Sequence, residues 1–472
     1  MKTVIKGGTV VTSTEQMSAD VLIDGEKVVA LAAPGSHDWE AGSDKVIDAS
    51  GKLVIPGGID VHTHMELPFG GTNASDSFET GSRAAAWGGT TTIVDFAVQV
   101  KGESAMDGFE AWMQKADGNC AIDYGFHMIT GDINEQTLKE MDMLVDEGVT
   151  SFKMFMAYPG VFYSTDGEIV LAMQKAAENG STIMMHAENG IAIDVLVQQA
   201  LARGETDPIY HGITRPSILE GEATHRAIRL AELTGAPLYI VHLSAAEALA
   251  EVTMARDEGM NVFAETCPQY LFLALADLGN GFEGAKYVCS PPLRPRDDGH
   301  QEFLWQGLAT NDLQIVSTDH CPFCFNDHPI LGTQKKLGEG DFSKIPNGMP
   351  GVEPRMELIY QGAVGEGRLN VNRWVEICST TPAKMFGLYP QKGTIAIGSD
   401  ADIVVFDPGT PRTISADSHH MNVDYSAYEG REVPGSVDTV LSRGRVIIEN
   451  DAYHGAPGDG QYLRRGTSQY LI

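Results

Sequence analysis

Basic residues are scarce in this chain. Its 472 residues include 33 lysines and arginines against 64 aspartates and glutamates, which gives a formal net charge of −31 at pH 7. Such an excess of negative charge repels phosphate backbones and anionic lipid, which argues against nucleic acid and membrane surfaces as partners. The sequence also has no apolar run long enough to span a bilayer, and no signal-peptide segment near its first residue. We therefore predict a cytoplasmic protein without nucleic acid or membrane partners.

Cysteine is also rare, with six in the whole sequence. So few thiols in so long a chain do not make the framework of a disulfide-stabilised protein. Cys321 and Cys324 form a C-x-x-C pair, a spacing found in redox pairs and in half-sites for zinc. No second pair of this kind accompanies it, so we interpret the six cysteines as reduced thiols.

Apolar residues make up 43% of the chain, enough for one large domain with a smaller one beside it. Both chain ends consist of short alternating segments separated by glycine-rich turns, a pattern typical of small antiparallel strands. Neither end is large enough to fold comfortably alone, so we predict that residues 1–53 and 389–472 combine into one β-sandwich. The strands expected in it are 3–11, 20–23, 27–31, 45–48, 393–397, 401–406, 439–441 and 445–448.

Between these ends, apolar strand candidates alternate with segments of helical periodicity. About eight such units predict a (β/α)₈ barrel over residues 54–388, with functional residues at the carboxyl ends of its strands. The long irregular stretches around 205–217, 270–300 and 321–355 are then loops over that face. The expected strands are 53–61, 90–96, 124–129, 151–156, 182–186, 238–242, 262–265 and 314–317, and the expected helices include 78–87, 136–146, 168–179, 223–234 and 245–258.

Polar residues of one kind recur where these strands end. His62 and His64 end the first strand and point to the same side, because side chains alternate along a strand. His186 and His242 end the fifth and sixth strands, and Asp319 follows the eighth. Taken singly, each has an ordinary explanation, such as a hydrogen-bonded core histidine or a helix N-cap. Together at one end of a barrel, they indicate a metal site.

Lys153 lies among apolar residues near the end of the fourth strand. Desolvation there disfavours its ammonium form. A neutral amine can add carbon dioxide and become a carbamate, a new carboxylate able to bridge two cations. The alternative is a lysine whose ammonium group reaches the barrel mouth and stays charged.

These segments resemble the metal signatures of the cyclic amidohydrolases, and within them the dihydropyrimidinase and hydantoinase branch. The resemblance runs essentially from end to end and rests on residues 62–64, 152–158, 186–190, 241–244, 317–322 and 400–405. It implies a site with two zinc ions bridged by carboxylated Lys153. One ion would be held by His62, His64 and Asp319, and the other by His186 and His242.

The resemblance also implies a mechanism. A hydroxide shared by the two metals attacks the scissile carbonyl, and Asp319 takes its proton as general base and returns it to the ring nitrogen as general acid. Tyr158 would donate its hydroxyl to the oxyanion. Ser290 and Asn347 would present backbone groups to the cyclic amide or imide. The alternatives are an exposed loop tyrosine and ordinary turns.

The implied reaction opens a dihydropyrimidine or a hydantoin ring to an N-carbamoyl amino acid. A dihydroorotase would place an arginine two residues after the second metal histidine, where this chain has Glu66, and an allantoinase fits the setting of Tyr158 less well. A non-catalytic scaffold that has lost its metal ligands is a third alternative, although all six ligand positions are present. Apolar loop residues beside the site predict a preference for 5-substituted rings: Leu67, Pro68, Phe69, Phe155 and Phe162.

The resemblance further implies a homotetramer. The C-terminal segment 460–472 carries tyrosines and paired arginines in an otherwise acidic chain, and we expect it to pack on a neighbouring subunit. The alternative is a disordered terminus.

Overall fold

Eight parallel strands form the centre of the molecule, in a computed structural model that describes residues 1–470. Each strand pairs with the next one along the chain, which is the order of a (β/α)₈ barrel and confirms the predicted fold class. Along the sheet they are β6 (Gly58–Thr63), β9 (Thr90–Val98), β10 (Asp123–Ile129), β11 (Ser151–Phe155), β12 (Thr182–His186), β13 (Leu238–Ile240), β14 (Val262–Thr266) and β15 (Ile315–Val316).

The seam between β6 and β15 is joined by single contacts instead of a regular ladder. The amide of His64 donates to the carbonyl of His320 (2.9 Å), and the Thr318 hydroxyl donates to Asp60 (2.6 Å). Arg355 is fully buried beside this seam, and its Nη1 donates to the carbonyls of Ile59 (3.1 Å), in β6, and Val316 (3.0 Å), in β15. A side-chain cation therefore ties the first strand of the barrel to the last.

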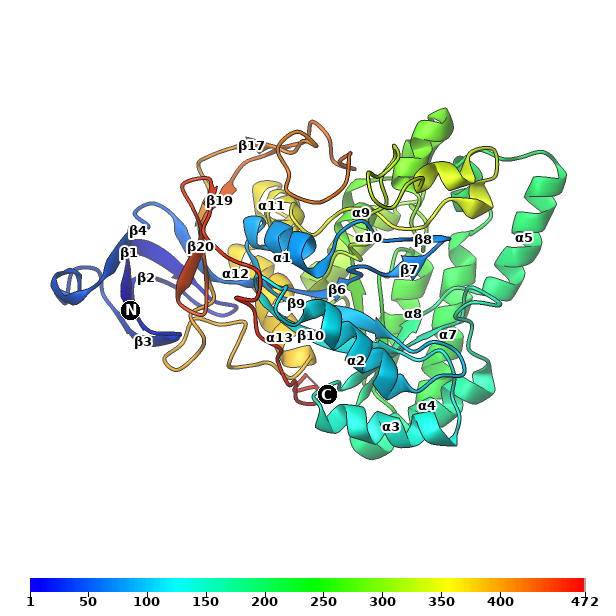
Figure 1. The fold of residues 1–472 in the computed structure, drawn as a ribbon, viewed down its shortest axis with the longest axis horizontal. Helices are drawn as coiled ribbons and strands as arrows, with labels where there is room; N and C mark the ends of the chain where they lie inside the picture. Colours follow the sequence, from blue (N-terminus) through cyan, green and yellow to red (C-terminus); the bar gives the residue numbers. More distant parts are fainter. Residues whose placement is uncertain (471–472) are drawn as a thin grey trace.

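Helices follow the strands and cover the outside of the barrel (Figure 1). Their ends carry local signals: Thr165 and Glu168 form a capping box at the start of α4, and Gly180 ends it in the left-handed conformation. No helix among residues 1–470 is long and apolar enough to cross a membrane. The α-helices are α1 (Phe78–Trp87), α2 (Ala105–Ala116), α3 (Glu135–Asp146), α4 (Asp166–Asn179), α5 (Gly190–Ala202), α6 (Ile209–Ile213), α7 (Ser217–Thr234), α8 (Ala246–Asp257), α9 (Pro268–Phe272), α10 (His300–Thr310), α11 (Arg355–Tyr360), α12 (Val371–Val375) and α13 (Thr381–Met385).

The two chain ends combine into one β-domain, as predicted, and Figure 1 shows its blue and red strands together on the left. The pairing of β5 with β16 joins the ends. The register of β1 shifts between Ile5 and Gly8. The strand pairs with β4 over residues 3–6 and with β5 at residues 9–10. The strands are β1 (Lys2–Val11), β2 (Gln16–Asp24), β3 (Lys27–Ala32), β4 (Lys45–Asp48), β5 (Leu53–Pro56), β16 (Ile403–Asp407), β19 (Ser436–Ser442), β20 (Arg445–Glu449) and β21 (Ala452–Tyr453), with short pairs β7 (Pro68–Phe69) and β8 (Thr72–Asn73), and β17 (Arg412–Thr413) and β18 (Glu432–Val433), elsewhere.

Two local expectations were wrong. The segment 53–61 is two strands, because the chain leaves the β-domain at Gly57 and enters the barrel at Gly58. Residues 393–397 are bends and irregular backbone, not a strand. The C-terminal segment packs on its own barrel up to residue 470: the amide of Leu463 donates to the carbonyl of Tyr124, and Arg465 is buried. Its contact with a neighbouring subunit stays a prediction. Residues 471–472 lie outside the described part, and the exact domain boundaries stay predictions.

Candidate active site

Three predicted metal ligands meet at the end of β6 and the turn after β15. The Nε2 atoms of His62 and His64 are 3.2 Å apart, and each is 3.2 Å from Oδ1 of Asp319. Two ligand atoms bound to one tetrahedral zinc at 2.0–2.1 Å stand about 3.3 Å apart. The donor atoms and their spacing therefore fit one divalent cation.

A buried carboxylate sets the orientation of His62. Nδ1 of His62 is hydrogen-bonded to the carboxylate of Glu265, in β14, so Nε2 of the same ring faces Asp319. Glu265 also accepts hydrogen bonds from the Tyr239 hydroxyl (2.9 Å) and the amide of His242 (3.2 Å). Such partners fix the ring and the tautomer of a metal-binding histidine. Sequence reasoning missed Glu265, although a carboxylate at the end of an apolar strand was a signal.

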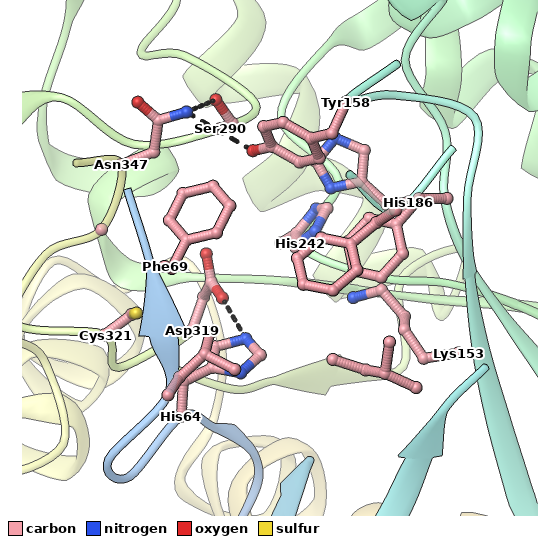
Figure 2. A pocket seen from close by; sticks show the side chains of 15 residues that line it. His64, Phe69, Lys153, Tyr158, His186, His242, Ser290, Asp319, Cys321 and Asn347 are labelled. Carbon is pink, nitrogen blue, oxygen red and sulfur yellow. Dashed lines mark hydrogen bonds and ion pairs between the residues drawn. The ribbon is translucent and has the colours of Figure 1, made fainter. Parts of the chain in front are cut away.

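The other three predicted ligands come from β11, β12 and the turn after β13. The ring centroids of His186 and His242 are 4.6 Å apart, and Figure 2 shows the Lys153 amine facing the histidines of the pocket. Nε2 of His186 is 2.7 Å from Oε2 of Glu188, which leaves Nδ1 for a ligand. Nδ1 of His242 is buried and has no hydrogen-bond partner among the described residues. Because buried polar atoms are normally paired, an unpaired Nδ1 is consistent with a ligand atom that binds a metal ion.

The protonation states of His64, His242 and Asp319 suit metal binding. Burial lowers the pKa of His64 to about 4 and that of His242 well below its usual range, so both rings are neutral near pH 7. Burial alone would raise the pKa of Asp319, but His62 and His64 hold it well below the ordinary value. Burial lowers the pKa of Lys153 to about 8. Neutral imidazole rings and an ionised carboxylate are the forms in which histidine and aspartate bind cations.

Two ligand residues and one pocket residue have strained backbones. His242, Asp319 and Tyr158 have φ angles of 39°, 52° and 59°, in the left-handed region. Conformations of this kind cost about 1–3 kcal/mol each in a residue with a side chain and cluster at functional sites. The fold therefore holds all three residues in place against the local preference of the backbone for negative φ.

A pocket lies directly over this cluster and brings the remaining predicted site residues together (Figure 2). Asn347 Nδ2 donates to the hydroxyl oxygens of Ser290 (3.1 Å) and Tyr158 (3.5 Å). Burial raises the pKa of the Tyr158 hydroxyl above its usual range, so the hydroxyl stays protonated. The pocket is lined by His64, Lys153, Tyr158, His186, His242, Ser290, Asp319 and Asn347, and His62 lies buried behind them.

Another part of the pocket wall is apolar and lies beside the polar residues. Phe162 stacks on Phe155 with ring centroids 5.0 Å apart, and Phe69 and Leu67 complete the surface. Pro68 is exposed and does not line the pocket, contrary to expectation. Cys321 lines it as a free thiol.

Comparison with known proteins gives one consistent result. The model of the amidohydrolase family matches residues 53–447. The D-hydantoinase of Streptomyces coelicolor is 66% identical over 472 residues, which cover 100% of this chain and 99% of that protein. The dihydropyrimidinase of Arabidopsis thaliana is 41% identical, with 99% of this chain and 86% of that protein covered. The crystal structure of dihydropyrimidinase from Brevibacillus agri is 50% identical and superposes with a TM-score of 0.95, covering 99% of each chain.

Proposed function

This chain belongs to the amidohydrolase family, and from that premise we propose the substrate and the chemistry of its pocket. It is a cyclic amidohydrolase, which opens a cyclic amide by hydrolysis. We propose that its substrates are dihydropyrimidines and, preferably, 5-substituted hydantoins, which it converts to N-carbamoyl amino acids. The observation that carries this choice is the apolar wall of Leu67, Phe69, Phe155 and Phe162 beside the ligand cluster. The relatives named D-hydantoinase support a preference for the D-enantiomer.

The ligand cluster would hold two divalent cations, for which we propose zinc. When bound, the cations make a nucleophile available near neutral pH and polarise the scissile carbonyl. The residues that would hold them are His62, His64 and Asp319 for one, His186 and His242 for the other, and carboxylated Lys153 between them.

Asp319 is the proposed proton carrier. Its Oδ1 faces the two histidines, which leaves Oδ2 for a proton. The attacking water gives a proton to this carboxylate while the oxygen of the water bonds to the carbonyl carbon. When the carbon–nitrogen bond of the ring breaks, the same proton passes to the leaving nitrogen. The Tyr158 hydroxyl would donate to the carbonyl oxygen as negative charge develops there.

A hydrolysis panel tests the proposal: 5-benzylhydantoin, hydantoin, dihydrouracil, allantoin and dihydroorotate. We expect 5-benzylhydantoin to have the highest kcat/KM and dihydroorotate the lowest. An apolar wall rewards each methylene-sized group by about 1–3 kcal/mol. Preferential hydrolysis of dihydroorotate or allantoin would contradict the proposal, and a zinc-free protein inactive on every substrate would favour the scaffold alternative.

Phe162→Ala is the matching variant. It should lower kcat/KM for 5-benzylhydantoin at least tenfold and leave unsubstituted hydantoin nearly unchanged, because only the substituent contacts the apolar wall. Val161→Ala is the control, since Val161 is the preceding residue and is 58% exposed.

We also propose that the enzyme is a cytoplasmic homotetramer. The outer helix α5 supports an interface between copies, because Ile191 and Val195 are each 53% exposed on it. Light scattering at micromolar concentration should give four times the mass of the chain. The double variant Ile191→Glu, Val195→Glu should give a lower mass. A monomer in the unmodified protein would reject the tetramer, and cell fractionation checks the location.

A further inference from the structure

Lys335 is a fully buried lysine outside the ligand cluster. It lies in the loop between β15 and α11, and its Nζ donates to the carbonyls of Val288 (3.2 Å), Pro346 (2.8 Å) and Gly348 (2.8 Å). An ammonium group has three N–H donors, so these three carbonyls use all of them. One side chain thus binds two separate loops, which carry the pocket residues Ser290 and Asn347.

These bonds determine how the backbone of Asn347 is oriented. A trans peptide group is planar, with its C=O and N–H pointing in opposite directions. The carbonyl of Pro346 points at Lys335, so the N–H of Asn347 points away from it. The amide of Gly348 donates to the carbonyl of Val288 (3.0 Å), so the carbonyl of Asn347 points away from Val288. Both backbone groups of Asn347, a residue that lines the pocket, therefore face away from the atoms that hold its loop and are left free for a ligand.

His211 acts on the other loop in the same way. Its Nε2 donates to the carbonyl of Cys289 (2.8 Å), and Arg215 donates to its Nδ1 (3.0 Å), which fixes the proton on Nε2. Burial and the charge of Arg215 keep the pKa of His211 well below its usual range, so the ring is neutral. Because the carbonyl of Cys289 is held by His211, the N–H of Ser290 points away from the histidine.

We propose that Lys335 and His211 are positioning residues, which orient the backbone groups of Ser290 and Asn347 to read the ring of the substrate. The inference rests on the proposed function. Beside the scissile carbonyl, which the cations and Tyr158 would polarise, a cyclic imide presents an N–H and a second carbonyl along the same edge. A backbone carbonyl and backbone N–H groups, supplied by Ser290 and Asn347, complement this N–H and this second carbonyl. The apolar wall reads the substituent, whereas this pair of loops reads the ring itself.

Lys335→Met is the test, with Lys336→Met as its control on the next, partly exposed residue. Loss of ring contacts that are equal in the ground and transition states raises KM with little change in kcat. We expect Lys335→Met to raise KM roughly 10- to 100-fold, the size of one to two lost hydrogen bonds. The rise should be the same factor for hydantoin and 5-benzylhydantoin, with bound metal and kcat nearly unchanged. Phe162→Ala, in contrast, affects only the substituted substrate.

Lys335→Gln and His211→Gln keep the test decisive if Lys335→Met does not fold. Each glutamine keeps N–H donors but places them differently from the original side chain. We therefore expect KM above that of the unmodified enzyme, by less than the roughly 10- to 100-fold rise expected for loss of all the donors. Unchanged KM in these variants would overturn the inference, as would a fall in kcat and bound metal at constant KM. An unmodified enzyme that hydrolyses no cyclic amide would instead reject the proposed function, so the two failures are distinguishable.

Discussion

Lys153 is the residue whose chemistry most clearly separates a two-metal site from a simple polar pocket. It is buried, and its amine lies 4.8 Å and 4.9 Å from the ring centroids of Phe96 and Phe155. If its carbamate bridges two cations, Lys153→Ala removes a ligand from both. We expect activity to fall by more than the 10- to 100-fold typical of residues that only orient a ligand, and bound metal to fall with it. Metal analysis and turnover measure both.

Small carboxylates provide the control for this variant. Acetate or propionate at millimolar concentration should partly restore metal and turnover to Lys153→Ala, because either fits the vacated space and supplies two oxygens. Lys153→Arg should not be rescued, since a guanidinium stays protonated and fills the space with positive charge. An unmodified Lys153 by intact mass, together with full zinc in Lys153→Ala, would contradict the bridge.

The same residue gives metal loading a pH dependence. Only the neutral amine adds carbon dioxide, and with a pKa of about 8 roughly one Lys153 in ten is neutral at pH 7. Reconstitution of metal-free enzyme with zinc, at a fixed concentration of dissolved carbon dioxide, should therefore accelerate about tenfold from pH 6 to 7, about fivefold from pH 7 to 8, and level off by about pH 9. His64, with a pKa of about 4, stays neutral over this range. A rate independent of pH between 6 and 8 would contradict the prediction.

The metal-ligand candidates could be predicted from the sequence because each ends a strand, and barrel strands all end at one mouth. The residues that orient these ligands and the pocket loops could not be predicted from the sequence. Glu265 and Lys335 act through contacts with other strands and loops, and no local periodicity encodes which carbonyl or ring a buried charge will meet. Such residues emerge only when the loops are placed in three dimensions.

At the scale of elements, the apolar strands were the easiest to predict, and the expected 182–186 and 78–87 coincide with β12 and α1. The run 53–61 was misread because both of its halves are apolar. Gly57 interrupts this run. Its amide donates to the backbone carbonyl of Asp402 (2.8 Å), and an added Cβ would lie 2.0 Å from the Thr91 hydroxyl. Periodicity does not show that a strand changes sheets, because both sheets bury the same kind of side chain.

The seam of the barrel makes Arg355 important for stability. Arg355→Met removes the donor to the carbonyls of Ile59 and Val316 and to the Thr90 hydroxyl (3.0 Å), and it leaves these acceptors buried. We expect the free energy of unfolding to fall by about 3–5 kcal/mol, since each unpaired acceptor costs about 1–3 kcal/mol. Thermal unfolding followed by circular dichroism measures the effect.

Arg229→Met is the matched control for the seam. Arg229 is an exposed arginine of α7 that pairs with Glu232 (2.8 Å). Exposed pairs of this kind contribute little, so its melting temperature should be unchanged. Equal melting temperatures for the two variants would show that the buried arginine does not hold the seam.

At the scale of the whole molecule, one buried lysine joins the β-domain to the barrel. Nζ of Lys392 is 2.5 Å from Asp123 in β10, and 3.0 Å and 2.6 Å from Asp400 and Asp402, which precede β16. The three carboxylates are grouped as they would be around a metal ion, but the ammonium group occupies that position. Lys392→Met would leave the three carboxylates with only Arg443, 3.0 Å from Asp123, and the half-exposed Lys27 as cationic partners, at a cost of about 3–5 kcal/mol.

Lys27→Met serves as the control for this joint. Lys27 binds the same Asp400 (2.5 Å), but its side chain is 47% exposed, so its removal should change stability little. Limited proteolysis measures the joint directly: Lys392→Met should release the β-domain strands earlier than either Lys27→Met or the unmodified protein. Equal cleavage rates would contradict the prediction.

The pairing of β5 with β16 also has a consequence for how the protein is made on the ribosome. β5 ends at Pro56 and β16 begins at Ile403, so about 350 residues must be synthesised after β5 before its partner exists. At about 5–20 residues per second this takes roughly 20–70 s. Throughout that time β5 is an exposed apolar sheet edge, the kind that recruits other strands and aggregates. The nascent chain therefore needs protection along this edge, because β5 is made early and is one of the last strands to be paired on both sides.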